Sequence, residues 1–281
     1  MKTDESAVAK EAKNSQPDDL LFGALRIFQP DGGTGPRVNV DTVLLAHFAR
    51  FADRARAVEF GCAQGAVSLI LAMRRKKRSA AHVMESEASA ALPARGHRPI
   101  DAFDINPALI DLARENAKLN GLSEDVNFFV ADLREHRKNF TSGSYDAVVM
   151  NPPYDEPDKS RPSPNGALAS ALHGACCGLT DVVAAAKYLL DNRGKLFLVM
   201  RAKRTGELFS LLSLNNVRPK RMRAVHPRPG GPASVVLVEA MRSSGDGLII
   251  EPPLFICGPD GKYTRELLEA YALDGGSLCR S

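Results

Sequence analysis

Residues 57–73 read AVEFGCAQGAVSLILAM, a short apolar run followed by a glycine-containing turn and a longer apolar run. The first run, Ala57–Phe60, has the length of a buried strand, whereas Ala66–Met73 has the length and composition of a buried helix. A strand that enters a helix through such a turn is the unit from which doubly wound sheets are built. The stretch therefore predicts an α/β fold.

The alternation of strand and helix continues to about residue 240. Helices are predicted from Pro107 to about Asn120, with Asn106 as the cap, and from about Thr180 to Leu190. Further strands are predicted at Ile100–Asp104, Val126–Val130, Tyr145–Met150, Lys195–Met200, Arg221–Val225 and Ser234–Ala240. The result is a Rossmann-like sheet of seven strands, mostly parallel, with an antiparallel last strand.

Composition and length bound the class of protein. The 281 residues carry a formal net charge of +4, which favours a phosphate-bearing partner without establishing one. Five cysteines without CxxC spacing indicate neither a zinc site nor a disulfide framework, so no metal is expected. Without a membrane-spanning run or a signal peptide, we expect a soluble cytoplasmic protein with no membrane partner.

The chain is expected to form one domain over residues 18–281, behind a disordered tail at residues 1–17. Residues 76–98 mix basic clusters with alanine and serine between two apolar segments. This composition predicts an inserted surface loop, part of which can be helical. The oligomeric state, monomer or homodimer, is open.

The turn after the first strand is a candidate cofactor site. Glu59, Gly61 and Gly65 would let backbone amides and an acidic side chain approach a ligand that carries an ammonium and a carboxylate, as S-adenosylmethionine does. Ala63 occupies the middle position, where a glycine is usual. Alone, the motif is equally compatible with a plain strand-to-helix turn.

Two aspartates end or follow the next two strands. Asp104 could accept both ribose hydroxyls of an adenosine moiety, or it could cap the following helix. Asp132 could accept from the adenine amino group of the cofactor. Ile105 and Leu133, which follow the two aspartates, are included in the predicted cofactor site.

The strongest motif is Asn151-Pro152-Pro153-Tyr154, at the predicted end of the fourth strand. The Asn151 side-chain oxygen and the Pro152 carbonyl can accept both hydrogens of a planar NH₂ group, which makes its nitrogen a better nucleophile. Pro153 stiffens the loop, and Tyr154 offers a face on which a flipped base can stack. The alternative, a Pro-Pro turn after a strand, leaves the ordered motifs upstream unexplained.

Other polar groups are less specific. A basic cluster around the sixth strand either contacts RNA phosphates, with Arg228 as the candidate substrate ligand, or forms a solvated sheet edge. His173 is interpreted as structural. The solvated acidic loop after the tetrapeptide comprises Asp155, Glu156 and Asp158, and the basic cluster comprises Arg218, Lys220, Arg221, Arg223, His226 and Arg228.

With these motifs the chain resembles a bacterial family, the tRNA adenine-N6 methyltransferases that modify the adenine beside the anticodon of valine tRNA. The resemblance spans Asp18 to Tyr271. It implies the seven-stranded methyltransferase sheet, S-adenosylmethionine as cofactor, RNA as partner, and Arg37, Asn39 and Asn151 in the cofactor site. The segments that carry it are Leu20–Gly23, Leu25–Pro30, Arg37–Asp41, Val43–Ala46, Val225–Arg228, Pro252–Leu254 and Tyr263–Thr264.

Two other functions remain open from the sequence. Release-factor glutamine methyltransferases share the tetrapeptide, because a glutamine amide presents the same planar NH₂, but they usually carry an N-terminal helical domain. Only about 50 residues precede the first predicted strand here. Ala63 motivates a third hypothesis, a non-catalytic RNA-binding protein with a degenerate cofactor site.

Overall fold

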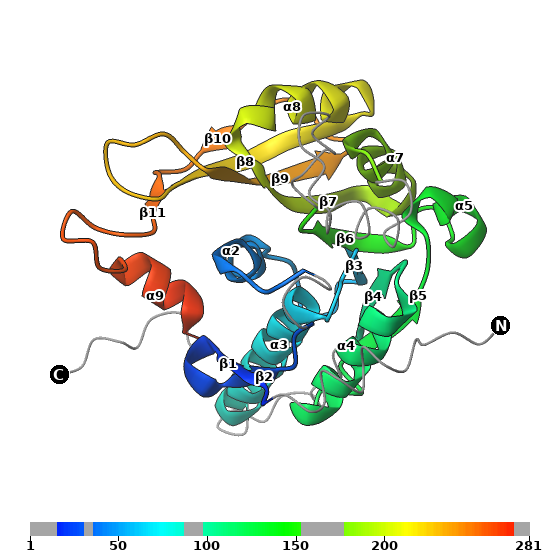
Figure 1. Ribbon diagram of the computed structural model, residues 1–281. Helices are drawn as coiled ribbons and strands as arrows, with labels where there is room; N and C mark the ends of the chain where they lie inside the picture. The colour runs from blue at the N-terminus through cyan, green and yellow to red at the C-terminus, as the bar shows by residue number, and fades with distance from the viewer. Residues whose placement is uncertain (1–15, 31–35, 87–97, 153–176, 273–281) are drawn as a thin grey trace, which may run out of the picture.

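The computed structural model describes residues 16–30, 36–86, 98–152 and 177–272. Within this part of the chain, the main sheet has nine strands in the order β10-β8-β9-β7-β6-β3-β4-β5, and β11 also pairs with β8 (Figure 1). The strands are β3 (Ala57–Phe60), β4 (Ile100–Asp104), β5 (Val126–Val130), β6 (Tyr145–Met150), β7 (Leu190–Arg201), β8 (Val217–His226), β9 (Val235–Arg242), β10 (Ile249–Ile250) and β11 (Leu254–Phe255).

The predicted seven-stranded sheet is confirmed. Strands β5, β4, β3, β6 and β7 are parallel neighbours, and β9 runs antiparallel between β7 and β8. The two-residue strands β10 and β11 extend the β8 edge and were not predicted, because their pairing depends on β8 and not on a pattern of their own.

Helices cover both faces of the sheet (Figure 1). The helices α2 (Val40–Phe48), α3 (Ala66–Ser86) and α4 (Pro107–Leu119) lie on one face, and α7 (Leu179–Leu189) and α8 (Thr205–Leu214) lie on the other. The remaining elements are the hairpin β1 (Asp18–Leu20) and β2 (Leu25–Ile27), the short helices η1 (Leu21–Gly23), η2 (Leu133–Glu135), α5 (His136–Asn139) and η3 (Ala202–Arg204), and α9 (Arg265–Tyr271), which packs on α2.

Alternate residues of the central strands belong to two separate cores. In β6, Ala147 and Val149 pack toward α2 and α3, whereas Val148 and Met150 pack toward α7. All four side chains are buried. Burial on both faces explains why these strands appear in the sequence as continuous apolar runs.

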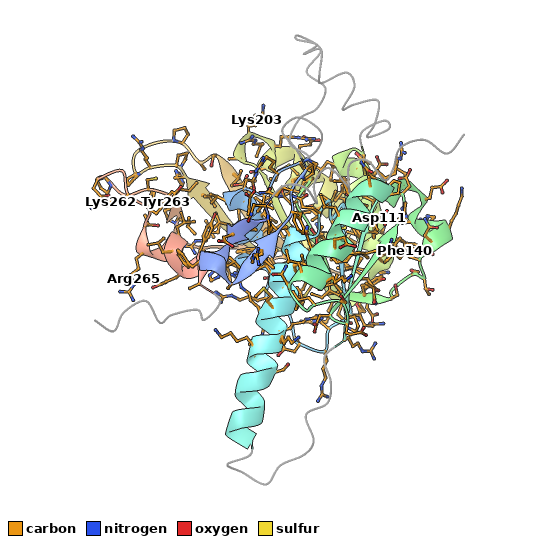
Figure 2. The ribbon with its side chains drawn as sticks, turned by 60° about the horizontal axis from the view of Figure 1, so that its bottom comes forward. Asp111, Phe140, Lys203, Lys262, Tyr263 and Arg265 are labelled. Atoms are coloured by element: carbon orange, nitrogen blue, oxygen red, sulfur yellow. The ribbon has the colours of Figure 1, made fainter. Side chains whose placement is uncertain are left out.

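The region predicted as a surface insertion, residues 76–98, is partly helical. Helix α3 extends to Ser86 and projects from the body of the molecule (Figure 2), so residues 76–86 form the helical part that the prediction allowed. The reason is the buried anchor before it: Arg75 is 1% exposed and donates hydrogen bonds to the carbonyls of Ala55 and Arg98. Residues 87–97 and the predicted tail up to residue 15 lie outside the described residues.

The hairpin β1–β2 is docked on α4 by two asparagines one helical turn apart. The Asn116 side chain accepts from the Phe28 amide at 2.7 Å and donates to the Phe28 carbonyl at 3.0 Å. Asn120 pairs in the same way with Arg26. The amide side chains thus substitute for a neighbouring strand and satisfy the backbone of the N-terminal segment.

None of the helices in the described part combines the length and the hydropathy that a bilayer-spanning helix requires.

Candidate active site

The predicted motifs converge at one edge of the sheet. Strand β3 lies between β6 and β4, and all three run parallel, so the turns that follow them meet at their carboxyl ends. This edge holds the glycine-containing turn after β3, Asp104 at the end of β4 and Asn151 directly after β6.

The turn after β3 keeps the shape of a glycine-rich turn despite Ala63. The backbone φ angles of Gly61, Ala63 and Gly65 are +62°, +48° and +87°, all in the left-handed region. Ala63 therefore adopts the conformation of the glycine it replaces, at a cost of about 1–2 kcal/mol. The turn gives no support to a decayed site.

The two glycines serve different purposes. Among the described residues, a Cβ on Gly61 would meet only Met150 Cε within 4 Å, at 3.9 Å, so no described atom crowds this position. A Cβ on Gly65 would lie 2.7 Å from the Phe128 ring and 3.2 Å from Ala113 Cβ. Gly65 is thus required for the packing of α3 against β5 and α4, and its predicted cofactor contact stays a prediction.

Asp104 joins the turn to the end of β4. Its Oδ2 accepts from the Ala63 amide and its Oδ1 from the Asn106 amide, both at 2.9 Å. The α4 cap is Asn106, whose side chain accepts from the Ala108 amide, so the capping alternative for Asp104 is wrong. The two hydrogen bonds hold the carboxylate in one orientation at the end of β4, and its predicted ribose contact stays a prediction.

Glu59 is buried beneath the turn, with 2% of its surface exposed. Its carboxylate accepts from the Ser68 amide at 2.9 Å and from the Ser68 hydroxyl, and so fixes the first turn of α3. Burial raises its pKa to about 8, and the neighbouring Asp104 acts in the same direction. A cation bound at this edge would stabilise the ionised form of Glu59.

Three further residues of the predicted cofactor site differ in exposure and in hydrogen-bond partners. Ile105 exposes 40% of its surface, so an apolar side chain stands open directly after Asp104, whereas Leu133 is buried. Asp132 caps η2 and forms a two-oxygen ion pair with Arg134, with a shortest distance of 2.6 Å. The Arg134 hydrogen bonds lower the pKa of Asp132, and they compete with the amino group that Asp132 was predicted to bind.

Asn151 is positioned by a chain of polar contacts. Its Nδ2 donates to Thr42 Oγ1 at 3.3 Å, and the Thr42 hydroxyl donates to Asn39 Oδ1 at 3.2 Å. Asn39 also caps α2 by accepting from the Thr42 amide. These contacts leave Asn151 Oδ1 as a buried acceptor without a hydrogen-bond partner in the described structure.

A buried acceptor without a partner is costly unless a ligand satisfies it. Pro152 is also buried. Pro153, Tyr154, Asp155, Glu156, Asp158 and His173 lie outside the described residues.

The N-terminal segment is tied to this site at two points. Arg37, predicted to bind cofactor, pairs with Asp18 at 3.0 Å. The Asn116 side chain donates at 3.0 Å to the carbonyl of Gln64 as well as to Phe28, and so connects the segment to the glycine-containing turn. Thr42 and Asn116 were not predicted; the i, i+4 spacing of Asn116 and Asn120 was the available signal.

The basic cluster of β8 is largely neutralised inside the fold. Arg221 pairs with Glu239 and Glu251, and Arg223 pairs with Glu266. Lys220 donates to two carbonyls and Arg218 lies 3.5 Å from Asp246, while the His226 ring contacts the Gly231 carbonyl. These contacts favour the structural alternative for the cluster. Arg228 is exposed, and its RNA contact stays a prediction.

Comparison with known proteins places the chain in a family. The family model described as the RMKL-like methyltransferase domain matches residues 57–226, which contain every strand of the site. The chain belongs to this methyltransferase family. The solved structure of a predicted O-methyltransferase from Agrobacterium tumefaciens matches the fold, with a TM-score of 0.62 and 19% identity over 83% of this chain and 97% of its own.

Two curated relatives bear on the reaction. A tRNA1(Val) (adenine(37)-N6)-methyltransferase of Photorhabdus laumondii is 26% identical to this methyltransferase over 82% of the chain and 84% of its own length. A putative protein N5-glutamine methyltransferase of Methanocaldococcus jannaschii is 41% identical, but over 24% of the chain and 30% of its own length. The predicted resemblance to the tRNA enzymes is confirmed, and the likeness to the glutamine enzyme is confined to one segment.

Proposed function

We propose that this methyltransferase transfers the methyl group of S-adenosylmethionine to N6 of an adenine in tRNA. The observation that carries the proposal is the buried Oδ1 of Asn151, which has no hydrogen-bond partner among the described residues and stands at the start of the Asn-Pro-Pro-Tyr sequence. The relatives matched over most of the chain, which bear the name of a tRNA adenine-N6 methyltransferase, support the choice of substrate.

The residues of the carboxyl edge fit this cofactor. The uncrowded Gly61, the fixed carboxylate of Asp104 and the exposed side chain of Ile105 offer groups for the amino-acid part, the ribose and the adenine, respectively. The buried Glu59 suits a molecule with a positive charge. When bound, S-adenosylmethionine supplies the electrophilic methyl group.

Asn151 would act on the substrate nitrogen. The lone pair of the adenine amino group is delocalised into the ring, which makes the nitrogen a poor nucleophile. Asn151 Oδ1 would accept one N–H hydrogen and the Pro152 carbonyl the other, which would favour a pyramidal nitrogen with an available lone pair. Thr42 holds the Asn151 amide in the required orientation. The proton leaves the charged product for water after transfer, so no general base is needed.

The experiment is a substrate comparison with labelled S-adenosylmethionine. Purified protein is incubated with unmodified tRNA or with a peptide release factor, and the products are digested and analysed. N6-methyladenosine in the tRNA supports the proposal, and methylation of the release factor alone would replace it with the N5-glutamine reaction. Absence of cofactor binding at millimolar concentration would instead support the non-catalytic alternative.

A further inference from the structure

An open cavity of about 700 Å³ lies at the edge of the sheet opposite the candidate active site. Its wall comes from the segment between α2 and β3, from the start of β6 and from the bulged start of β7. Four of its lining residues are basic, namely Arg50, Arg54, Arg193 and Lys195, and one is acidic, Asp146.

The charges of this cavity are not cancelled. Asp146 accepts three hydrogen bonds from Arg56, which lower its pKa and occupy the carboxylate. Lys195 pairs with Glu239 at 2.7 Å. By contrast, Arg50, Arg54 and Arg193 are exposed and contact no acidic group or other hydrogen-bond acceptor among the described residues.

Two further observations indicate that the arrangement is built and electropositive. Arg193 lies in the β7 bulge with φ at +61°, a conformation that costs an L-residue energy, and it lines the cavity. On the last turn of α2, burial and the charges of Arg74 and Arg50 lower the pKa of His47 to about 4. The positive field therefore extends along the helix.

Helix α2 connects this cavity to the candidate active site. Thr42, near its N-terminus, contacts Asn151, and Arg50 follows its C-cap. The helix rises by roughly 9 Å from Thr42 to its last residue, Phe48, and two further residues lead to Arg50. A few nucleotides of an RNA strand span such a distance, so phosphates on either side of a flipped adenine could reach the cavity.

We propose that the cavity lined by Arg50, Arg54 and Arg193 binds backbone phosphates of the RNA substrate at a distance from the methylated base. This inference rests on the proposed function and adds a second contact surface to it. Guanidinium groups suit the role, because they bind phosphate oxygens through two parallel hydrogen bonds. Arg221 and Arg223 of β8 cannot supply these phosphate contacts, because they are paired with carboxylates inside the fold.

The test is tRNA binding by the full-length double variant Arg54→Gln/Arg193→Gln across a range of salt concentrations. Because each lost phosphate contact lowers the salt slope by about 1, we expect a slope lower by about 2 and an affinity at low salt reduced roughly tenfold or more. Cofactor affinity and kcat at saturating tRNA should stay at wild-type values. Lys187→Gln, an exposed residue of α7 on the opposite face of the sheet, removes the same kind of charge and should leave the slope unchanged.

Unchanged tRNA affinity and salt slope in the double variant would overturn the proposal. Calorimetry with inorganic phosphate tests whether the cavity is only a small-anion site. If the double variant loses phosphate binding but keeps wild-type tRNA binding, the proposal is also overturned. Binding and methylation are measured separately. Wild-type protein that binds tRNA without methylating it would contradict the proposed reaction but not the proposed role of the cavity in tRNA binding. Arg54→Glu provides a second variant, and circular dichroism confirms that each variant is folded.

Discussion

The two edges of the sheet differ in how their polar and charged side chains are held. At the carboxyl edge, carboxylates and amides are fixed by the backbone: Asp104 holds two amides and Glu59 holds the start of α3, while Asn151 Oδ1, like Gln64 Oε1 of the turn, has no partner among the described residues. At the amino edge, Arg50 and Arg193 are exposed and unpaired among the described residues. The comparison indicates precise positioning of one reacting group at the first edge and adaptable binding of a charged polymer at the second.

The largest effect is expected for Asn151→Ala. Removing a polar group that acts on the reacting atoms typically costs 10²–10³-fold in kcat, and we expect a loss of about 10³-fold with cofactor affinity within a few-fold of wild type. Single-turnover methyl transfer and cofactor titration check the two parts. Thr42→Ser, which keeps the hydroxyl that orients Asn151, is the matched control and should retain most activity. A small effect of Asn151→Ala would contradict the assignment of chemistry to this edge.

Gly65→Ala should affect stability most. The new Cβ would lie 2.7 Å from the Phe128 ring at a φ of +87°, so we expect a loss of about 2–4 kcal/mol in the free energy of unfolding. Gly121→Ala is the control, because its φ is +64° but no atom lies within 4 Å of the added Cβ. Chemical denaturation of both variants separates crowding from backbone strain. Equal losses would show that the close contact with Phe128 carries no cost.

Asn116→Leu should destabilise the protein and weaken cofactor binding together. The change removes the partners of the Phe28 backbone and of the Gln64 carbonyl, at a cost of about 2 kcal/mol or more. Asn120→Leu removes the contacts with Arg26 and the hydrogen bond to the Asn116 carbonyl but leaves the Gln64 contact of Asn116 in place, so it should affect cofactor affinity little. Denaturation and calorimetry measure the two quantities. Equal effects on cofactor affinity would contradict a link between Asn116 and the turn.

These effects show what could be predicted from sequence. Strands β3, β4, β6 and β7 were predicted because burial on both faces produces apolar runs, and Asn106-Pro107 marks a helix start by local chemistry alone. Helix α2 was not predicted as an element, because six of its nine residues are buried and no amphipathic period is visible. The hairpin β1–β2 depends on Asn116 and Asn120 of a distant helix, and the cavity at the amino edge depends on which arginines remain unpaired after folding.

The raised pKa of Glu59 predicts a pH dependence of stability and of cofactor affinity. Burial raises its pKa from the usual 4.5 to about 8, so the folded protein keeps a proton that the unfolded chain has released, and stability falls as pH rises from about 4.5 to 8. A cationic cofactor favours the ionised form, so its affinity should increase by up to about tenfold per pH unit below 8. Glu59→Gln should abolish both dependences. Calorimetry and denaturation between pH 5 and 9 check this, and a persistent slope in the variant would implicate another group.

Ala63→Gly should have the smallest effect. Glycine adopts the φ of +48° without strain, so we expect a gain in stability of about 1 kcal/mol or less and unchanged cofactor affinity. Differential scanning calorimetry measures the change. A loss of stability would show that Ala63 is not strained in this turn.

The most direct test is nucleoside analysis of tRNA from cells that lack the gene, complemented with wild-type protein or with Asn151→Ala. We predict that N6-methyladenosine at one tRNA position disappears on deletion, returns with the wild-type protein and stays absent with the variant. Full N6-methyladenosine in the deletion strain, or its restoration by Asn151→Ala, would contradict the proposed reaction.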